Sequence, residues 1–266
     1  HVAAFIKSFY RRSDMSMLEL TPDFIKEFAA YLSTEAGLRN GSIWANCMWL
    51  KGVVMKAHYN GLIPRNPFIQ FHISPNVKER EYLTEDELKA VMTHEFADSK
   101  LAYIRDIFIF ASFTALSFVD IQELTNDNIV EVNGEKWILS KRHKTKVAFQ
   151  VKLLDIPLQI VERYRPMQKD NRIFPGLNYW SICKPLKRMI RECGITKSIS
   201  FHCSRHGFAT LALSKGMPIE SVSRVLGHTN IVTTQLYAKI TTQKLDNDLT
   251  MFGDKLSKTF NGITIS

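Results

Sequence analysis

Apolar residues near the start of the chain recur with the spacing of a helix. In the segment FIKEFAAYL, Phe24, Phe28 and Leu32 lie at positions i, i+4 and i+8, which share one face of a helix. Thr21 and Pro22 stand just before this segment, as an N-cap residue and a proline in the first helical turn. The pattern therefore predicts an amphipathic helix that begins at this proline.

Further helices are predicted on either side of it. Residues 1–12 form one, and a longer helix follows the break at residues 39–42 and runs to about residue 59. Two prolines within residues 61–68 end the longer helix. Residues 1–71 are thus expected to form a compact unit of about four helices. The apolar residues that recur along the longer helix are Trp44, Met48, Val53 and Ala57.

The next segment is typical of a linker followed by a second domain. Residues 72–81 lack apolar periodicity and carry a proline and mixed charge. Thr84 then caps a new helix, and Glu87 closes a capping box ahead of an apolar run. We expect the second domain over residues 82–252 and a C-terminal tail over residues 253–266, for which a frayed terminus is the alternative.

A short strand-rich patch interrupts the helices of the second domain. Residues 136–139 and 147–153 alternate apolar and polar positions, and residues 142–145 form a hairpin between them. The predicted fold is therefore mainly α with a small antiparallel β-sheet. It combines a helical first domain with a mixed α/β second domain.

The composition favours a folded protein with a polyanionic partner. The 266 residues are 45% hydrophobic and 23% charged, carry a formal net charge of +9 and include no apolar run long enough to cross a membrane. A basic chain suits nucleic acid, and a merely soluble basic protein is the alternative. The four cysteines form no C-x-x-C pair, which argues against zinc and disulfides and fits a reducing cytoplasm. The chain begins without Met or a signal-peptide pattern, so we expect a segment of a longer protein that lacks an upstream domain.

Polar residues of the first domain are candidate phosphate contacts. A solvated helix face is the alternative interpretation for such a set, and it is the better one when the set is taken alone. The candidates are Arg39, Asn40, Ser42, Lys51 and Lys56.

The candidate chemistry lies between residues 200 and 239. His202 and Arg205 are three residues apart and so share one face of a helix. The planar guanidinium of an arginine can hold two phosphate oxygens at once, and a histidine can donate to the same phosphate or accept a proton. The neighbouring His206 is expected to face elsewhere and to be structural.

A glycine, a histidine and a tyrosine follow in the same stretch. Gly227 ends a short predicted helix, His228 stands at the turn, and Tyr237 lies nine positions after that histidine. A histidine that follows a helix-ending glycine can simply compensate the helix dipole. A tyrosine with an ordinary pKa of about 10 needs nearby cations and a base to act as a nucleophile. The arginine and the histidines of this stretch can provide them.

These motifs resemble those of the tyrosine recombinases, the phage-integrase family. The run LGHTNIVTTQLYAKI is similar to the family pattern LGHxxxxTTxxYxH/K. The segment AHYNGLIPRNPF is similar to the end of the family's DNA-clamping domain, and YLTEDEL to the start of its catalytic domain. The resemblance implies that Tyr237 is the nucleophile and that Arg205, His202 and His228 assist it.

The family also holds a catalytic lysine on a hairpin of this kind. The run HKT matches that position, so the resemblance implies Lys144 as the general acid, with Lys141 and Lys146 as competitors. A solvated basic turn is the alternative, because exposed lysines are common on hairpins.

One residue departs from the family pattern. Most tyrosine recombinases read T-G-L-R, with the arginine on the scissile phosphate, whereas this chain reads TALS and ends at Ser117. The chain resembles most the integrases of Bacteroides-type conjugative transposons, which share that serine; without the family, it is a polar residue in a turn. Losing one preorganised donor costs about 2.7–4 kcal/mol. Arg142 lies two residues before Lys144, and alternate strand residues point the same way, so we hypothesise that Arg142 replaces the missing guanidinium.

The resemblance implies a mobile-element integrase that needs neither ATP nor a metal. Tyr237 attacks a backbone phosphate to form a 3′-phosphotyrosyl bond, Lys144 protonates the departing 5′ oxygen, and strand exchange passes through a Holliday junction. The implied partners are double-stranded DNA, a homotetramer coupled by its C-terminal tails, and accessory DNA-bending proteins, all in a bacterial cytoplasm. Two alternatives stay open: a type IB topoisomerase and a catalytically silent DNA-binding relative.

Overall fold

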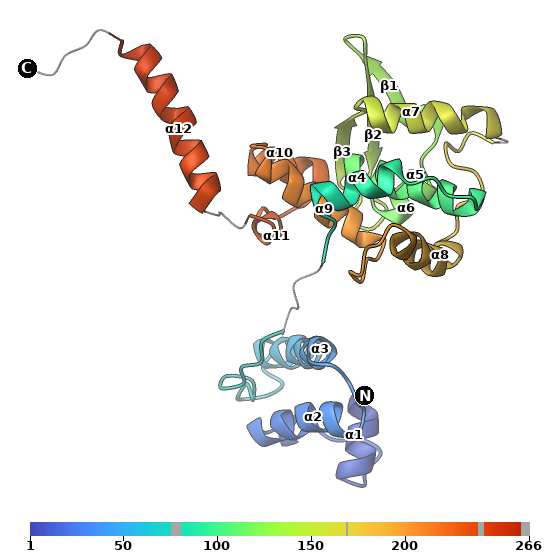
Figure 1. Cartoon of the computed structure of the whole chain (residues 1–266). Helices are drawn as coiled ribbons and strands as arrows, with labels where there is room; N and C mark the ends of the chain where they lie inside the picture. Colours follow the sequence, from blue (N-terminus) through green and yellow to red (C-terminus); the bar gives the residue numbers. More distant parts are fainter. Residues whose placement is uncertain (76–80, 169, 239–241, 262–266) are drawn as a thin grey trace, which may run out of the picture. The chain divides into compact units, whose positions relative to one another are not determined.

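The chain forms two compact units, His1–Glu79 and Arg80–Ser266. The expected linker over residues 72–81 spans their junction, and its residues 76–80 lie outside the described part of the chain. Within the described part, no helix is both long and apolar enough to cross a membrane. Figure 1 shows the computed structural model, which describes residues 1–75, 81–168, 170–238 and 242–261.

The first unit is helical, and its middle helix begins where its cap predicts. The hydroxyl of Thr21 accepts a hydrogen bond from the amide of Phe24 at 3.2 Å, and Pro22 occupies the first helical position. The first helix is shorter than predicted, because Arg11 adopts a left-handed backbone conformation (φ +54°) just after it. The elements of this unit are α1 (Val2–Phe9), the 3₁₀ turn η1 (Met17–Glu19), α2 (Pro22–Thr34) and α3 (Asn40–Tyr59).

The core of the first unit surrounds Phe5. Its ring lies 5.2 Å from the ring of Phe24 and 5.5 Å from that of Phe28, and all three are fully buried. The prediction for α3 is wrong at Val53, which is 52% exposed, while its neighbour Val54 is fully buried. A shift of one position turns a side chain by about 100° around a helix. The buried face of α3 consists of Ile43, Cys47, Val54 and Ala57.

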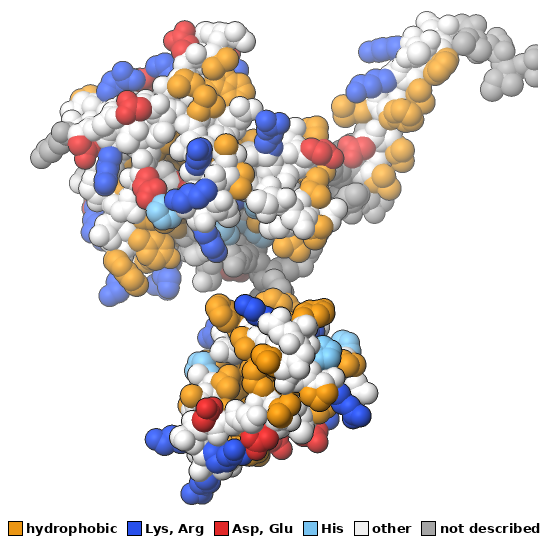
Figure 2. Space-filling model, turned by 180° about the vertical axis from the view of Figure 1, so that it is seen from behind, with side chains coloured by type: hydrophobic (Ala, Val, Ile, Leu, Met, Phe, Trp, Pro, Cys, Tyr) orange, Lys and Arg blue, Asp and Glu red, His pale blue; other side chains and the backbone are white. Residues whose placement is uncertain are grey.

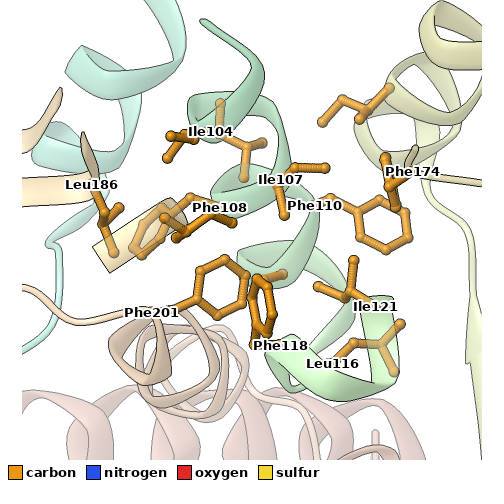
Figure 3. Packing of buried hydrophobic residues seen from close by; sticks show 14 of the residues in the cluster. Ile104, Ile107, Phe108, Phe110, Leu116, Phe118, Ile121, Phe174, Leu186 and Phe201 are labelled. Carbon is orange, nitrogen blue, oxygen red and sulfur yellow. The ribbon is translucent and has the colours of Figure 1, made fainter. Parts of the chain in front are cut away.

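The second unit is built around one apolar helix, α5 (Ser99–Thr114). It packs against α7 (Asp155–Tyr164), α8 (Tyr179–Glu192) and α9 (His202–Ser214). Figure 3 shows Phe108 and Phe110 of α5 among the rings and aliphatic chains of the surrounding elements. The ring of Phe201 lies 6.1 Å from that of Phe108, and the ring of Phe174 lies 4.9 Å from that of Phe110. The second unit also contains the helices α4 (Glu85–Thr93), α6 (Phe118–Gln122), α10 (Ile219–Leu226) and α11 (Val232–Gln235).

Two sets of hydrogen bonds stabilise the helices of the second unit. The predicted capping box of α4 is present: the amide of Glu87 donates to the hydroxyl of Thr84 at 3.2 Å, and the amide of Thr84 donates to the carboxylate of Glu87 at 2.7 Å. Asp106 of α5 is buried and accepts hydrogen bonds at 2.7 Å from both Arg163 and the hydroxyl of Tyr164, which ties α5 to α7.

A three-stranded antiparallel sheet completes the second unit, and its strands follow one another in the order of the chain. Ile138 at its centre pairs with Ile129 on one side and Val151 on the other. The predicted fold class, mainly α with a small antiparallel sheet, is confirmed. The strands and 3₁₀ turns are η2 (Asn126–Asn128), β1 (Ile129–Val132), β2 (Glu135–Lys141), β3 (Ala148–Lys152) and η3 (Arg165–Met167).

The last helix, α12 (Thr242–Thr259), carries an exposed apolar stripe, and Figure 2 shows hydrophobic side chains along it. The expected boundary between residues 252 and 253 falls inside this helix. The positions 239–241 and 262–266, which include the end of the predicted motif and of the predicted tail, lie outside the described residues. The stripe consists of Leu245, Leu249, Phe252 and Leu256.

Candidate active site

The turn between α5 and α6 holds the residue that departs from the family pattern. Ser117 is the N-cap of α6: its hydroxyl accepts a hydrogen bond from the amide of Asp120 at 3.3 Å. The same hydroxyl donates to the carboxylate of Asp120 at 2.8 Å. Just before it, Ala115 adopts a left-handed conformation (φ +57°) that ends α5. The serine therefore orients an acidic side chain, which the sequence reading did not single out.

That acidic side chain binds Arg142. The carboxylate of Asp120 accepts from Arg142 Nη1 at 2.8 Å and from the backbone amide of His143 at 2.9 Å. Burial tends to raise the pKa of Asp120, but the hydrogen bonds from His143, Arg142 and Ser117 together hold it below its usual range. The carboxylate is therefore ionised at neutral pH and can pair with a guanidinium.

Arg142 is buried on all sides by protein. Its Nη2 donates to the carbonyl of Val225 at 2.6 Å, and its guanidinium lies 4.0 Å over the ring of Phe149. Its Nε is buried and has no hydrogen-bond partner among the described residues. Burial lowers the pKa of Arg142, and Asp120 opposes that shift. The expectation that Arg142 points the same way as Lys144 is wrong.

The reason lies in the hairpin. The amide of Arg142 still donates across the hairpin to the carbonyl of Val147 at 2.8 Å, and the amide of Lys146 donates to the carbonyl of Arg142 at 2.8 Å. The turn therefore starts directly after Arg142, and the alternation of side chains along strand β2 does not continue to Lys144. Lys144 lies at the exposed tip of this hairpin, and Lys141 and Lys146 are exposed as well. Because all three lysines are exposed, exposure does not identify which of them is the general acid.

Arg205 approaches the same place from α9. Its Nη1 donates to the carbonyl of Ala115 at 2.8 Å, and its Nη2 donates to the carbonyl of Leu226. Burial, and after it the charge of Arg142, lowers the pKa of Arg205 to about 10. The two guanidiniums are thus close enough to repel each other, although both are buried. Such a site favours an anion that neutralises both.

The turn after α10 makes room for this pair. Gly227 adopts a left-handed conformation (φ +61°), and a Cβ atom placed there would lie 2.9 Å from Arg142 Nε and 3.0 Å from its Cγ. The carbonyls of Val225 and Leu226, in the last turn of α10, accept hydrogen bonds from Arg142 and Arg205. Glycine is therefore needed both for the backbone conformation and for the space that Arg142 fills.

His228 lies next to these cations. Its Nδ1 is 2.8 Å from the hydroxyl of the buried Thr234. Burial, and after it the charges of Arg205, Arg142 and His202, lower the pKa of His228 to about 4. The imidazole is thus neutral at pH 7, which argues against compensation of the helix dipole as its role. His202, the exposed first residue of α9, also lies near the site, because its charge contributes to the lowered pKa of His228.

Tyr237 lies against two imidazole rings. Its ring is stacked with that of His228 at 6.5 Å between centroids and an interplanar angle of 16°. The ring of His206 approaches it at 4.7 Å and 81°, in a T-shaped arrangement. The expectation that His206 faces elsewhere is wrong, because the segment that carries Tyr237 brings its ring against His206 of α9. No local pattern in the sequence predicts this contact.

The candidate phosphate contacts of the first unit lie along α3. Arg39, Asn40 and Ser42 are exposed at its N-terminal end, and the amide of the Asn40 side chain donates to the carbonyl of Ser74 at 3.4 Å. Lys56 is exposed near the C-terminal end, whereas Lys51 is only partly exposed. Among the described residues, no group of histidines, cysteines and carboxylates could hold a metal ion.

The chain is similar to known recombinases over most of its length. The profile of the phage integrase family matches residues 81–244, and that of the phage integrase SAM-like domain matches residues 1–73. The tyrosine recombinase XerA of Pyrococcus horikoshii is 32% identical over 177 residues, which are 61% of this chain and 58% of that protein. The tyrosine recombinase XerC of Lactobacillus leichmannii is 25% identical over 229 residues, 80% of this chain and 77% of that protein.

Solved structures share the fold. The Tn1549 transposon integrase in complex with a circular intermediate DNA has a TM-score of 0.75 at 18% identity, covering 88% of this chain and 86% of that one. A lambda integrase dimer bound to a core site has a TM-score of 0.68 at 18% identity, covering 89% and 86%. Because the family profile covers more than half of the chain and encloses the site described above, this chain belongs to the phage integrase family, the tyrosine recombinases.

Proposed function

We propose that this chain is a site-specific recombinase that cuts and rejoins double-stranded DNA, with Tyr237 as the nucleophile. The observation that carries the proposal is the convergence of Arg142 and Arg205, two buried guanidiniums, with His228 beside the tyrosine ring. Asp120 pairs with Arg142, whereas Arg205 donates to backbone carbonyls, so the two desolvated cations leave a site with excess positive charge. A DNA phosphodiester supplies the missing negative charge.

In this reaction the Tyr237 oxygen attacks the phosphorus, and the bond to the 5′ oxygen of the next nucleotide breaks. The product is a 3′-phosphotyrosyl link and a free 5′ hydroxyl, so the phosphate remains an ester and the step needs no external energy source. Arg142 and Arg205 stabilise the phosphate oxygens with the N–H groups that their protein partners leave unused. His228, neutral at pH 7, and His202 supply hydrogen bonds and a site for the tyrosine proton.

Lys144 is assigned as the acid that protonates the 5′ oxygen. Its place at the tip of a hairpin whose base is fixed by Arg142 allows it to reach a bound DNA strand, and an ammonium group can give up a proton to an alkoxide. Lys141 and Lys146 stay as competitors.

A finer proposal concerns the source of the chain. We assign it to the integrases of mobile elements, of the type found in conjugative transposons of Bacteroides, because Ser117 stands where the resemblance places an arginine in most tyrosine recombinases and a serine in those integrases. Arg142 then supplies the guanidinium that this position lacks. The buried Asp120–Arg142 pair supports the assignment, because it fixes an arginine beside Arg205.

The DNA interface extends beyond the reacting phosphate. Trp180, Lys184, Lys187 and Arg191 are exposed at positions i, i+4, i+7 and i+11 of α8, which form one helix face. Within the described residues, the three cations on this face have no carboxylate partner at ion-pair distance. We assign this face to the DNA backbone, together with the set on α3: Arg39, Asn40, Ser42, Lys51 and Lys56.

Further copies of the chain are the proposed protein partners, in a DNA-bound tetramer. The exposed apolar stripe of α12 has the spacing of a helix that packs against another protein surface. Changing Leu249 and Phe252 to aspartate should reduce the size of the complex on DNA, measured by light scattering, while Lys255→Asp should change it little. Equal sizes for all variants would remove α12 from the interface.

A suicide substrate with a nick near the cleavage site tests the proposed function against its two alternatives. A covalent adduct that requires Tyr237, followed by ligation to a second duplex, supports a recombinase. Ligation only to the original strand supports a type IB topoisomerase, and no adduct supports a silent DNA-binding relative.

A further inference from the structure

Three aromatic rings form a row that ends at the proposed nucleophile. The ring of Tyr82 lies 5.4 Å from that of His206, with an interplanar angle of 31°. The ring of His206 lies 4.7 Å from that of Tyr237, at 81°. We propose that His206 is a positioning residue, which holds the ring of Tyr237 for attack, and that Tyr82 supports it from the other side. This inference rests on the proposed role of Tyr237.

The element that carries Tyr237 gives it little support of its own. Helix α11 has four residues, Val232–Gln235, and Tyr237 lies just beyond it, with its amide donating to the carbonyl of Thr234 at 3.0 Å. Single turns of helix are marginal without tertiary contacts. The neighbouring Leu236 is 71% exposed, so its side chain adds little packing. Side-chain contacts must therefore set the direction of the phenol ring.

The other end of the row is rigid. The carbonyl of Tyr82 accepts a hydrogen bond from Lys197 Nζ at 3.2 Å, and the same Nζ pairs with Glu87 at 2.6 Å. Glu87 closes the capping box of α4, so Tyr82 is tied to the start of a helix and to the segment before α9. His206 itself follows Arg205 on α9, whose guanidinium is fixed by two backbone carbonyls.

The two imidazoles on Tyr237 have different relations to it. His228 stacks nearly parallel to the phenol ring at 6.5 Å, a distance that leaves the ring free to tilt. His206 meets it at 4.7 Å and nearly at a right angle, within the range of favourable T-shaped contacts. A contact of this kind restricts both the tilt and the rotation of the phenol. Small errors in the position of an attacking atom are costly to the rate.

Single-turnover adduct formation on saturating suicide DNA tests the proposal. His206→Ala should slow adduct formation by about tenfold, the effect of losing one such ring contact, while the Kd for DNA stays unchanged. His206→Phe keeps an aromatic ring in place and should restore most of the rate. Tyr82→Leu should slow the reaction by a smaller factor, and it serves as the second variant if His206→Ala fails to fold, as judged by thermal melting.

A substrate with sulfur in place of the bridging 5′ oxygen separates positioning from acid catalysis, because a thiolate leaves without protonation. The His206→Ala defect should persist on this substrate, as expected for a residue that acts on the nucleophile. The proposal is overturned if His206→Ala reacts at the wild-type rate, if sulfur restores its rate, or if His206→Phe is as slow as His206→Ala. If the unaltered protein forms no Tyr237-dependent adduct, the proposed function itself is wrong. That outcome is distinguishable from failure of the His206 proposal, because it is seen before any His206 variant is compared.

Discussion

The carboxylate of Asp120 pairs with the guanidinium of Arg142 at 2.8 Å, and both side chains are buried. Ser117, at the position where the resemblance to most tyrosine recombinases leads us to expect an arginine, donates its hydroxyl to the same carboxylate at 2.8 Å. The serine is therefore linked to Arg142 through one acidic side chain. Two hydrogen bonds thus connect the position where an arginine is expected to Arg142, its proposed replacement.

This pair predicts a large cost when its acid is removed. Asp120→Ala leaves the Arg142 guanidinium buried without a counter-charge, and breaking a buried pair in this way costs about 3–5 kcal/mol of unfolding free energy. The control is Glu135→Ala, which removes the partner of Lys152 in an exposed pair and should cost at most about 1 kcal/mol. Urea unfolding of both variants measures the difference, and equal costs would mean that the buried pair contributes no more than a surface pair.

Replacing Gly227 should displace the side chain of Arg142. Gly227→Ala introduces a Cβ that collides with the Arg142 side chain and strains a left-handed backbone, so adduct formation should fall together with stability. Gly216→Ala is the matched control, because Gly216 also has a positive φ (+88°) but has no atom within 4 Å of an added Cβ. It should cost only the backbone strain, about 1–2 kcal/mol, and leave the adduct rate unchanged.

The collision with Arg142 can be separated from the backbone strain at Gly227 by making the same substitution in the Arg142→Ala variant. When Arg142 is already alanine, Gly227→Ala should cost no more unfolding free energy than Gly216→Ala. If Gly227→Ala still costs clearly more in that background, the space at this turn is needed for something other than Arg142.

His228 should make the protein less stable as the pH falls below neutrality. Its pKa is lowered to about 4 by burial and by Arg205 and Arg142, whereas an unfolded histidine has a pKa of about 6.5. Between these pH values the unfolded chain binds the proton and the folded chain does not. The unfolding free energy therefore decreases as the pH is lowered from about 6.5 to about 4. Urea unfolding at pH 7 and pH 5 should show a smaller drop for His228→Gln than for the unaltered protein. Equal drops would argue against a buried, neutral His228.

Lys144 should act on the leaving oxygen. Lys144→Ala is expected to slow cleavage by about 10²–10⁴ on ordinary DNA and to recover on DNA with a bridging 5′ sulfur, which needs no acid. Lys141→Ala and Lys146→Ala, the exposed neighbours on the same hairpin, should keep nearly the full rate on ordinary DNA. If one of them shows the defect and the sulfur rescue instead, that lysine is the acid.

Sequence reasoning succeeded where the cause of a structure is local. Thr21 and Thr84 cap their helices as predicted, because an N-cap depends on residues two or three positions away. The i, i+4 spacing of Phe24 and Phe28 also predicts their burial correctly. The motif residues Arg205 and His228 lie close together, as the resemblance implies.

What the sequence could not supply depends on contacts between distant parts of the chain. Asp120 and Arg142 are 22 positions apart, and no local rule pairs them. The strand rule failed for Arg142 and Lys144, because the turn of the hairpin starts directly after Arg142. His206 looks structural in the sequence, since only the folding of the chain after α10 brings Tyr237 against its ring.

The most direct test of the account is the rate of adduct formation by Arg142 and Arg205 variants on saturating suicide DNA. Arg142→Ala should lose about 10²–10³ in rate, the effect of removing one preorganised donor to the phosphate, and Arg142→Lys, which keeps a cation beside Asp120 but loses the fork, should also be slow. Arg205→Ala should be inactive, and the exposed Arg172→Ala should react normally. If Arg142→Ala cleaves at the unaltered rate while Arg205→Ala is inactive, Arg142 does not replace the missing arginine.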